Sequence, residues 1–328
     1  MEKISLNTTR SLIPPVYYDL SRVGENELAY RHYNVRHPCA IFSIHFSDVI
    51  KAFNDLSLLI NNLQLSQQIL TEEQMEQLQS STITFLLRLT NYFDCGYEIF
   101  LCFCNKHDQP SQKEYLHTWF EKNKYTEVKE YFKNIKELNI YRNFFNELKH
   151  SSHRLAIFQV LSPDSTKILG WYLEGVNDAG AIGPVQDFHP QFDGMYTVWS
   201  YDFHLRIFYY LIYKIAIEID EVVHKLCQKN SINLPIGNIP LNPVHIEELC
   251  SKAFSGFGRR FNDRGIFYSQ EVGQKTKKVV LDVDHGTLSF EDFYPQKTLD
   301  PKSKKVFHTR GDGFSRSFNM IFTKGDEK

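Results

Sequence analysis

One polar stripe on a predicted helix carries the side chains of this 328-residue chain that could do chemistry. Residues 136–153 read KELNIYRNFFNELKHSSH, and at helical spacing the polar residues fall on one face and the aromatic residues on the other. The polar face consists of Arg142, Asn143, Asn146, Lys149, His150 and, if the helix continues for one more turn, His153. Arginine and lysine can bind an anion, and histidine can transfer a proton near neutral pH. The alternative is an ordinary solvated face, although such faces usually mix Glu with Lys.

Two carboxylates further upstream could serve the same site. Asp94 and Glu98 interrupt an apolar helical segment and share one face because they lie four residues apart. Such a pair can act as general acid and base or bind a ligand, but more often it faces water or a cationic neighbour. A third role for the pair is to orient Arg142.

The pattern along the chain predicts a mainly α (α+β) fold, in which a helical bundle carries a β-hairpin insertion and a β-rich C-terminal extension. Long helices are expected from Ser47, from the capping signal at Thr71, and over residues 201–228, whose middle is apolar on nearly every face. Residues 154–175 alternate in polarity around a Pro-Asp-Ser turn, as a β-hairpin requires. One or two short helices should precede the polar stripe, with Tyr115, Leu116, Trp119 and Phe120 as their packing face.

These elements divide the chain into three expected parts. Residues 1–46 lack a core of their own and are expected to form an extended N-terminal arm. Residues 47–230 should form the helical core domain, and residues 231–328 a basic, β-rich C-terminal extension.

Composition favours a cytoplasmic protein without a metal or cofactor. The six cysteines include no CxxC pair and are interpreted as buried free thiols. The thirteen histidines form no cluster with cysteine at zinc spacing. The N-terminal residues lack the apolar core of a secretory signal, and charges within residues 201–228 argue against a membrane span.

Charge is distributed unevenly along the chain. The net charge of −2 gives no overall attraction to nucleic acid, so a partner of this kind must be bound by a local patch. Residues 252–328 contain 15 Lys and Arg against 10 Asp and Glu. In this basic tail Arg259 and Arg260, flanked by Phe257 and Phe261, could hold a nucleic-acid backbone and stack a base, and a solvated turn is the alternative.

The polar stripe resembles the motif of the HEPN superfamily of helical-bundle proteins. That motif is an Arg, commonly followed by Asn, with a His four to six residues further on and a Glu shortly upstream. Arg142 and Asn143 match it, Glu137 lies at the upstream acidic position, and His150 follows after seven residues. The resemblance covers residues 47–228, a helical region that closes with a long apolar helix.

The resemblance implies a metal-independent ribonuclease or toxin-type RNA-processing protein, often part of bacterial defence, or an RNA-binding relative. Such proteins are usually dimers in which two motif helices face each other. His150 would be the base or acid, Arg142 would bind the scissile phosphate, Lys149 would add charge, and Asn143 or Asn146 would orient the imidazole or the phosphate. The longer spacing rotates His150 by about 100° around the helix. A non-catalytic RNA- or nucleotide-binding protein and a helical interaction or scaffold protein therefore stay open as alternatives.

Overall fold

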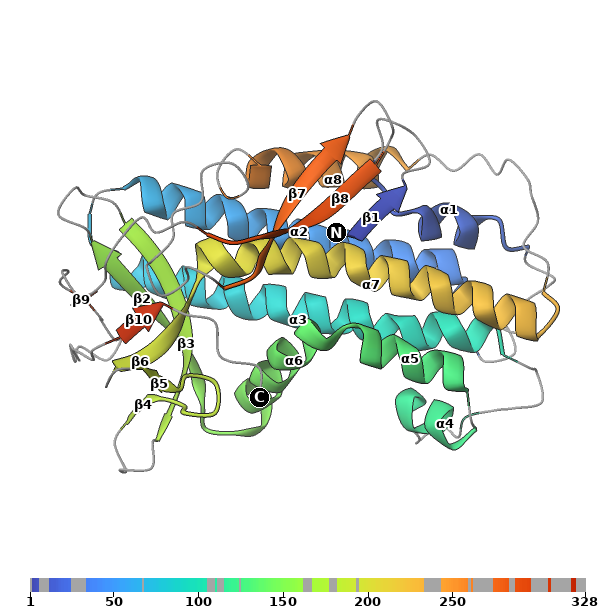
Figure 1. Cartoon of the computed structure of the whole chain (residues 1–328), viewed down its shortest axis with the longest axis horizontal. Coiled ribbons are helices and arrows are strands. Elements are labelled where there is room, and N and C mark those ends of the chain that lie inside the picture. Colours follow the sequence, from blue (N-terminus) through green and yellow to red (C-terminus); the bar gives the residue numbers. More distant parts are fainter. Residues whose placement is uncertain are drawn as a thin grey trace.

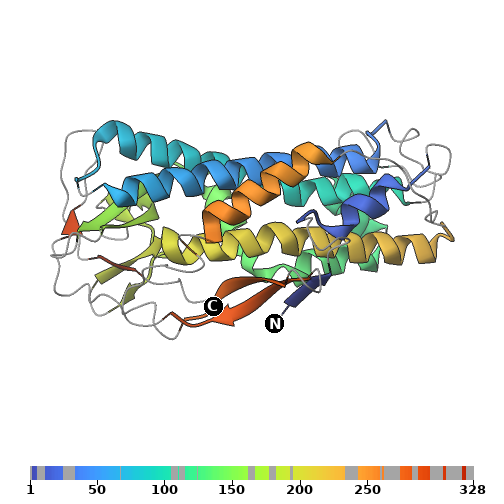
Figure 2. The same cartoon turned by 90° about the horizontal axis from the view of Figure 1, so that it is seen from above.

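An elongated bundle of helices with a β-sheet at one end forms the body of the molecule (Figure 1). The computed structural model describes residues 2–5, 12–24, 34–66, 68–104, 110, 115–123, 125–161, 167–176, 182–192, 195–232, 243–258, 261, 274–282, 287–295, 306–307 and 320–322. The helices are α1 (Pro15–Ser21), α2 (Pro38–Leu65), α3 (Glu72–Cys102), α4 (Leu116–Lys122), α5 (Thr126–Asn134), α6 (Lys136–His150), α7 (Tyr201–Lys229) and α8 (Val244–Phe257). The long helices α2, α3 and α7 lie side by side along the bundle (Figures 1 and 2). The mainly α fold class is therefore confirmed.

The N-terminal region is more helical than the sequence pattern predicted. α2 begins at Pro38 rather than at Ser47, and α1 lies within the N-terminal arm that was expected to be extended. Both helices have a proline in their first turn, where the missing N–H costs no hydrogen bond. The His37 ring caps α2 by accepting a hydrogen bond from the Cys39 N–H over 3.2 Å. The prolines that suggested irregular structure thus mark helix starts.

The helix predicted from the capping signal at Thr71 is confirmed as α3. The Thr71 hydroxyl accepts from the Gln74 N–H over 3.3 Å, and the Gln74 side chain accepts from the Thr71 N–H over 3.0 Å. Further along α3, a Cβ at Gly96 would lie 2.7 Å from the hydroxyl of Tyr131 on α5. The glycine therefore allows the Tyr131 ring to pack closely on α3, where its hydroxyl donates to the Phe93 carbonyl over 2.9 Å.

α7 is the central helix, as its apolar sequence predicted. The Ser200 hydroxyl caps its start by accepting from the Phe203 N–H over 3.2 Å. Every side chain from Tyr201 to Tyr213 is buried, because α7 packs against α2, α3, α5 and the C-terminal strands. Among the described helices, none combines the length and the apolar character of a membrane span.

Two sheets complete the fold. Their strands are β1 (Glu2–Ser5), β2 (Arg154–Leu161), β3 (Lys167–Val176), β4 (Ile182–Pro184), β5 (Gln191–Phe192), β6 (Met195–Ser200), β7 (Thr276–Asp282), β8 (Thr287–Phe293), β9 (Val306–Phe307) and β10 (Met320–Phe322). The predicted hairpin is confirmed, since β2 pairs antiparallel with β3 along the whole length of β2, from Arg154↔Glu174 to Leu161↔Lys167. The larger sheet has the order β10-β6-β3-β2-β9, with β4 on β3 and β5 on β6, and the smaller has the order β1-β8-β7.

The larger of two hydrophobic clusters contains residues from all three parts expected from the sequence. Val16 of α1, Phe257 of α8 and Phe290 of β8 belong to the same buried cluster as the long helices. Figure 2 shows α8 running obliquely between α2 and α7, with β7 and β8 on the outer side of α7. In the described part of the chain, the arm and the C-terminal extension thus contribute to the core of the bundle.

His189, just before β5, is fully buried and is expected to make the fold sensitive to acid. Its Nε2 accepts the Leu173 N–H over 2.9 Å. Burial lowers the pKa of His189 to about 3, and a hydrogen bond with the Thr197 backbone opposes the shift. The ordinary pKa in the unfolded chain is about 6.5, so this stabilising difference is complete above pH 6.5 and is lost as the pH falls toward 3.

We expect the wild type to lose about 2 kcal/mol more free energy of unfolding between pH 7 and pH 5 than His189→Gln, whose amide oxygen can still accept the Leu173 N–H. Urea denaturation of both proteins at the two pH values measures this difference. Equal losses would show that His189 is not the group that titrates.

Candidate functional site

A cavity of about 420 Å³ lies between α3, α4, α5 and α6. Figure 1 shows α5 and α6 following one another along one side of α3, with α4 beyond α5. The lining combines aromatic and apolar side chains, charged side chains and three asparagines: Tyr97, His117, Phe120, Glu121, Val128, Lys129, Lys133, Asn139, Arg142, Asn143 and Asn146. Its volume is in the range of about 300–1,000 Å³ that is usual for small-molecule sites.

The polar stripe predicted from the sequence supplies one wall of this cavity. Arg142, Asn143 and Asn146 line it, and Asn139 extends the wall by one turn of α6. Three aromatic rings on the opposite face are buried in the core: Tyr141, Phe144 and Phe145. The predicted amphipathic helix is therefore confirmed, and three of its polar residues meet in one place.

Arg142 is held at the cavity by α3. Its Nη2 lies 3.3 Å from Asp94 Oδ1, and its guanidinium carbon lies 4.7 Å from the centre of the Phe93 ring. Burial raises the pKa of Asp94 above its usual value, while the charges of Arg142, Lys149 and His117 act in the opposite direction. Because 51% of the Asp94 side chain is exposed, the ion pair contributes little to stability and mainly orients the guanidinium. Of the two acidic residues noted on this helix, Asp94 is the one that contacts Arg142.

The acidic and basic side chains of α5 lie on different faces of the helix. Glu127 and Glu130 point toward α7, where their carboxylates lie 3.1 Å from Lys229 Nζ and 2.9 Å from Lys225 Nζ. Lys129 and Lys133 lie four residues apart and line the cavity instead. The acidic side chains of this helix thus pair with lysines of α7, while its two basic side chains Lys129 and Lys133 line the cavity.

Aromatic side chains form the opposite part of the lining. The Tyr97 and Phe120 ring centres lie 6.1 Å apart, and the His117 ring lies 6.3 Å from Tyr97. Burial raises the pKa of Tyr97 to about 12, so its hydroxyl keeps its proton at neutral pH. Trp119 and Phe120 pack inward as predicted, but Tyr115 is 77% exposed and does not belong to the packing face. It lies before the first turn of α4 and stacks on the exposed His117 ring.

The remaining predicted site residues lie elsewhere. Lys149 Nζ lies over the Phe145 ring of its own helix, 4.3 Å from the centre, and His150 is exposed in the last turn of α6. His153 does not continue the stripe, because α6 ends at His150; its Nδ1 lies 3.1 Å from Glu147 Oε2 instead. None of these three lines the cavity. Arg259 and Arg260 lie outside the described residues.

His117 is the titratable ring in the cavity lining, and no pattern in the sequence singled it out. It comes from a helix of seven residues with no capping side chain, so only the packing of α4 against α3 and α5 brings it into the cavity that Arg142 also lines. A second group was also missed: Asp19, Asp220 and His224 form the one cluster among the described residues whose ligand atoms could hold a metal ion. Asp220 and His224 are four residues apart on α7, but zinc patterns built from cysteine and histidine do not include an aspartate.

In this second cluster, the pKa of the Asp220 carboxyl group is shifted by its surroundings. Burial raises the pKa of Asp220 to about 6; His224 opposes the shift, and the carboxylates of Asp19 and Glu221 add to it. A nearby positive charge would therefore favour the ionised form of this carboxyl group.

Comparison of the chain with protein-family models, with curated proteins and with solved structures finds no match. The functional conclusion therefore rests on the geometry of this chain alone.

Proposed function

We propose that the cavity between α3, α4, α5 and α6 binds a nucleoside phosphate, either as a free nucleotide or as one nucleotide of a single-stranded RNA. The observation that supports this function best is the meeting of three cationic side chains and three asparagine amides with an aromatic wall. Cationic side chains bind a phosphate, asparagine amides can hydrogen-bond to the polar edge of a base, and an aromatic wall can stack on the face of a base.

The phosphate would be bound by Lys129, Lys133 and Arg142. Arg142 has a planar guanidinium that suits two phosphate oxygens at once, and Asp94 and Phe93 already hold it in position. Lys129 and Lys133 add two further charges from α5. Glu121 is the acidic residue in the lining, so positive charge prevails there.

The base would stack on the wall formed by Tyr97 and Phe120, with the His117 ring beside it. Stacking on an aromatic ring contributes about 1–3 kcal/mol for each base and does not depend strongly on sequence. The asparagine amides both donate and accept, so they can pair with the polar edge of the base. A base in a duplex cannot enter such a cavity, which favours a single strand.

The experiment that tests this proposal compares two lysine pairs. Lys129→Ala with Lys133→Ala removes two charges from the cavity, while Lys51→Ala with Lys136→Ala removes two from exposed helical positions outside it. We expect the first pair to weaken binding of a fluorescein-labelled, uridine-rich single-stranded RNA by roughly tenfold or more. The salt slope of binding should fall by about 0.7 for each phosphate that the variant no longer neutralises. The second pair should bind as the wild type does.

Fluorescence anisotropy over a series of salt concentrations gives both quantities, and competition with AMP and UMP separates free nucleotide from RNA. If only the mononucleotides bind, the ligand is a free nucleotide. Equal weakening by the two lysine pairs, or no binding of RNA and mononucleotides by the wild type, would remove the cavity from consideration as a nucleoside-phosphate site.

A second candidate is the metal-independent ribonuclease that the HEPN resemblance implies. The observation that favours it is that His117 and Arg142 line the same cavity, so a proton-transferring ring and a phosphate-binding guanidinium would face one ligand. Cleavage by the 2′-hydroxyl of the RNA needs only these two functions. On this proposal His117, which lines the cavity, acts as the base or acid in place of His150, which does not line it.

A further inference from the structure

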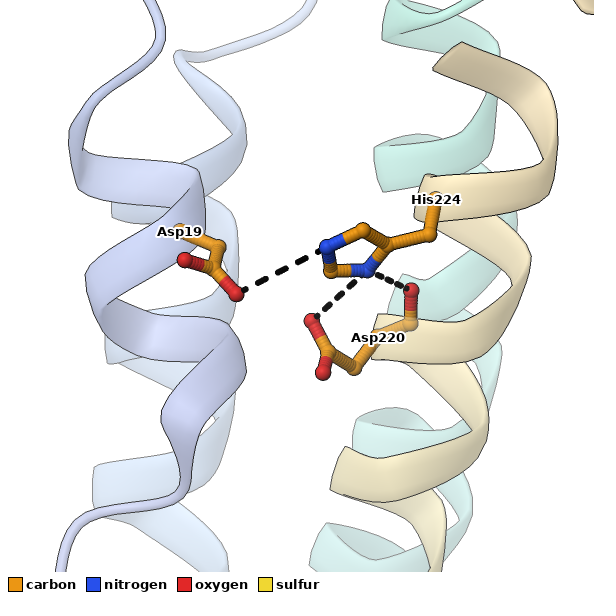
Figure 3. Close-up of side chains that lie close together, drawn as sticks. All are labelled: Asp19, Asp220 and His224. Carbon is orange, nitrogen blue, oxygen red and sulfur yellow. Dashed lines mark hydrogen bonds and ion pairs between the residues drawn. The ribbon is translucent and has the colours of Figure 1, made fainter. Parts of the chain in front are cut away.

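A second cluster of polar side chains connects α1 to the C-terminal half of α7. It consists of Asp19 on α1 and of Asp220 and His224 on α7 (Figure 3). One ligand atom from each of these residues lies within 4.8 Å of the other two. Figure 3 shows the Asp19 carboxylate and the His224 ring pointing toward each other across the space between the two helices.

The hydrogen bond of the His224 ring decides which of its nitrogens can bind a ligand. Nδ1 lies 2.9 Å from the main-chain oxygen of Asp220, and because a carbonyl oxygen only accepts, Nδ1 donates a proton. In the neutral ring Nε2 then carries the lone pair. Metal-binding histidines are typically held in this way, with the other ring N–H donating to a backbone carbonyl or a carboxylate.

The lone pair of His224 Nε2 faces an oxygen that also only accepts. Nε2 lies 3.9 Å from Asp19 Oδ2, which is too long for a direct hydrogen bond. Two acceptors on either side of one space repel each other unless a cation or a proton lies between them. Metal bonds of about 2.0–2.2 Å to nitrogen and to oxygen span such a gap.

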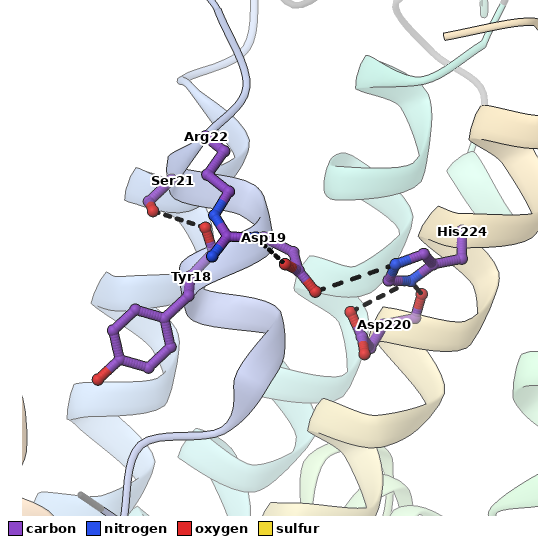
Figure 4. Close-up of polar contacts among 6 residues, drawn as sticks. All are labelled: Tyr18, Asp19, Ser21, Arg22, Asp220 and His224. Carbon is purple, nitrogen blue, oxygen red and sulfur yellow. Dashed lines mark hydrogen bonds and ion pairs between the residues drawn. The ribbon is translucent and has the colours of Figure 1, made fainter. Parts of the chain in front are cut away.

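Charge around the cluster also favours a cation. Arg22 Nη1 lies 3.4 Å from Asp19 Oδ1, on the side of the carboxylate away from His224 (Figure 4). Asp220 Oδ1 is buried, has no hydrogen-bond partner in the described part of the chain, and lies 3.4 Å from His224 Nδ1. Glu221 adds a further negative charge beside the pair. Two carboxylates thus face the imidazole while one arginine contacts the outer edge of the first.

We propose that Asp19, Asp220 and His224 bind one divalent transition-metal ion of the Zn²⁺ type, and that this ion fastens α1 to α7. A donor set of one imidazole and two carboxylates suits Zn²⁺, whereas Mg²⁺ prefers an octahedral shell of oxygens. Three protein ligands leave one tetrahedral position for water. Because the His224 side chain is half exposed, the ion can reach the cluster from solvent.

Zinc binding to the full-length protein tests this proposal. The purified protein is treated with EDTA, dialysed, and titrated with ZnCl₂ or MgCl₂ by isothermal calorimetry, after which its thermal unfolding is recorded. We expect one Zn²⁺ to bind per chain and Tm to rise by about 5 °C at a zinc concentration roughly 100 times Kd. Mg²⁺ should not bind under the same conditions.

Two variants connect the binding to the cluster. His224→Gln removes the imidazole from a half-exposed position without disturbing the core, and it should weaken zinc binding at least about tenfold and abolish the rise in Tm. His245→Gln removes an exposed histidine of α8 that is not in the cluster, and it should bind zinc as the wild type does. Unchanged zinc affinity in His224→Gln overturns the proposal. Absence of zinc binding by the wild type also overturns it and leaves an ion pair between a protonated His224 and Asp19.

Discussion

Leu211→Asp is expected to prevent the chain from reaching its folded state. Leu211 lies in the middle of α7 and is completely buried, and α7 packs against helices and strands from every part of the chain. An aspartate there places a carboxylate without a partner in an apolar interior, which costs several kcal/mol. Domains are typically stable by only about 5–15 kcal/mol, so this substitution removes much or all of the stability.

The measurement is circular dichroism with thermal melting, and the control is the same substitution at an exposed leucine. Leu58 on α2 is 44% exposed, so Leu58→Asp should melt cooperatively within about 0.5 kcal/mol of the wild type. We expect Leu211→Asp to show reduced helical signal, no cooperative transition and aggregation on a sizing column. A Leu211→Asp protein that is soluble and melts cooperatively would contradict the central position of α7.

Arg142→Ala should lower RNA cleavage by roughly a hundredfold or more, if the cavity is the site of a metal-independent ribonuclease. The guanidinium would stabilise the charge that develops on the phosphate in the transition state, and loss of such a donor typically costs this much in rate. His117→Ala should cause a loss of similar size, because removal of a general acid or base costs about 10²–10⁴-fold. Both variants should melt as the wild type does, since His117 is exposed and the Asp94 partner of Arg142 is half exposed.

The assay is cleavage of labelled single-stranded RNA in the presence of EDTA, with His150→Ala as the matched histidine control. His150 is exposed and does not line the cavity, so its loss should change the rate little. A large loss in His150→Ala with none in His117→Ala would favour the role that the HEPN motif spacing gives to His150. If the wild type binds RNA without cutting it, the cavity is a binding site without catalysis.

Local sequence signals predicted the long helices and the β2–β3 hairpin, but they missed α1 and did not predict how the helices dock. The capping box at Thr71 and the all-round apolarity of residues 201–228 are properties of adjacent residues, and both located their helices. Helical spacing also placed Arg142, Asn143 and Asn146 on one face. The same spacing put His150 on that face, but the cavity lining on α6 ends at Asn146, and His150 lies one turn further along, in the last turn of the helix.

The missed residues belong to contacts between segments far apart in the chain. His117 joins the cavity only because α4 packs against α3 and α5, and Asp19 meets His224 only because α1 packs against α7. Pro38 was misinterpreted for another reason. Proline is unfavourable in the interior of a helix but fits its first turn, so a proline alone does not tell whether a helix is interrupted or begins there. His37, which supplies the cap, decides between the two.

The pairing of β1 with β8 has a consequence for how the protein is made. Glu2 pairs with Phe290 and Ser5 with Thr287, so the partner that β1 has among the described strands is absent until residues 287–290 have been synthesised. At about 5–20 residues per second, the ribosome delivers that partner roughly 15–60 s after the first strand. During this interval β1 has unpaired backbone N–H and C=O groups that can attract other chains. Closure of the smaller sheet is therefore a late step of biosynthesis, and slow translation would prolong the period in which the nascent chain is exposed to misassembly.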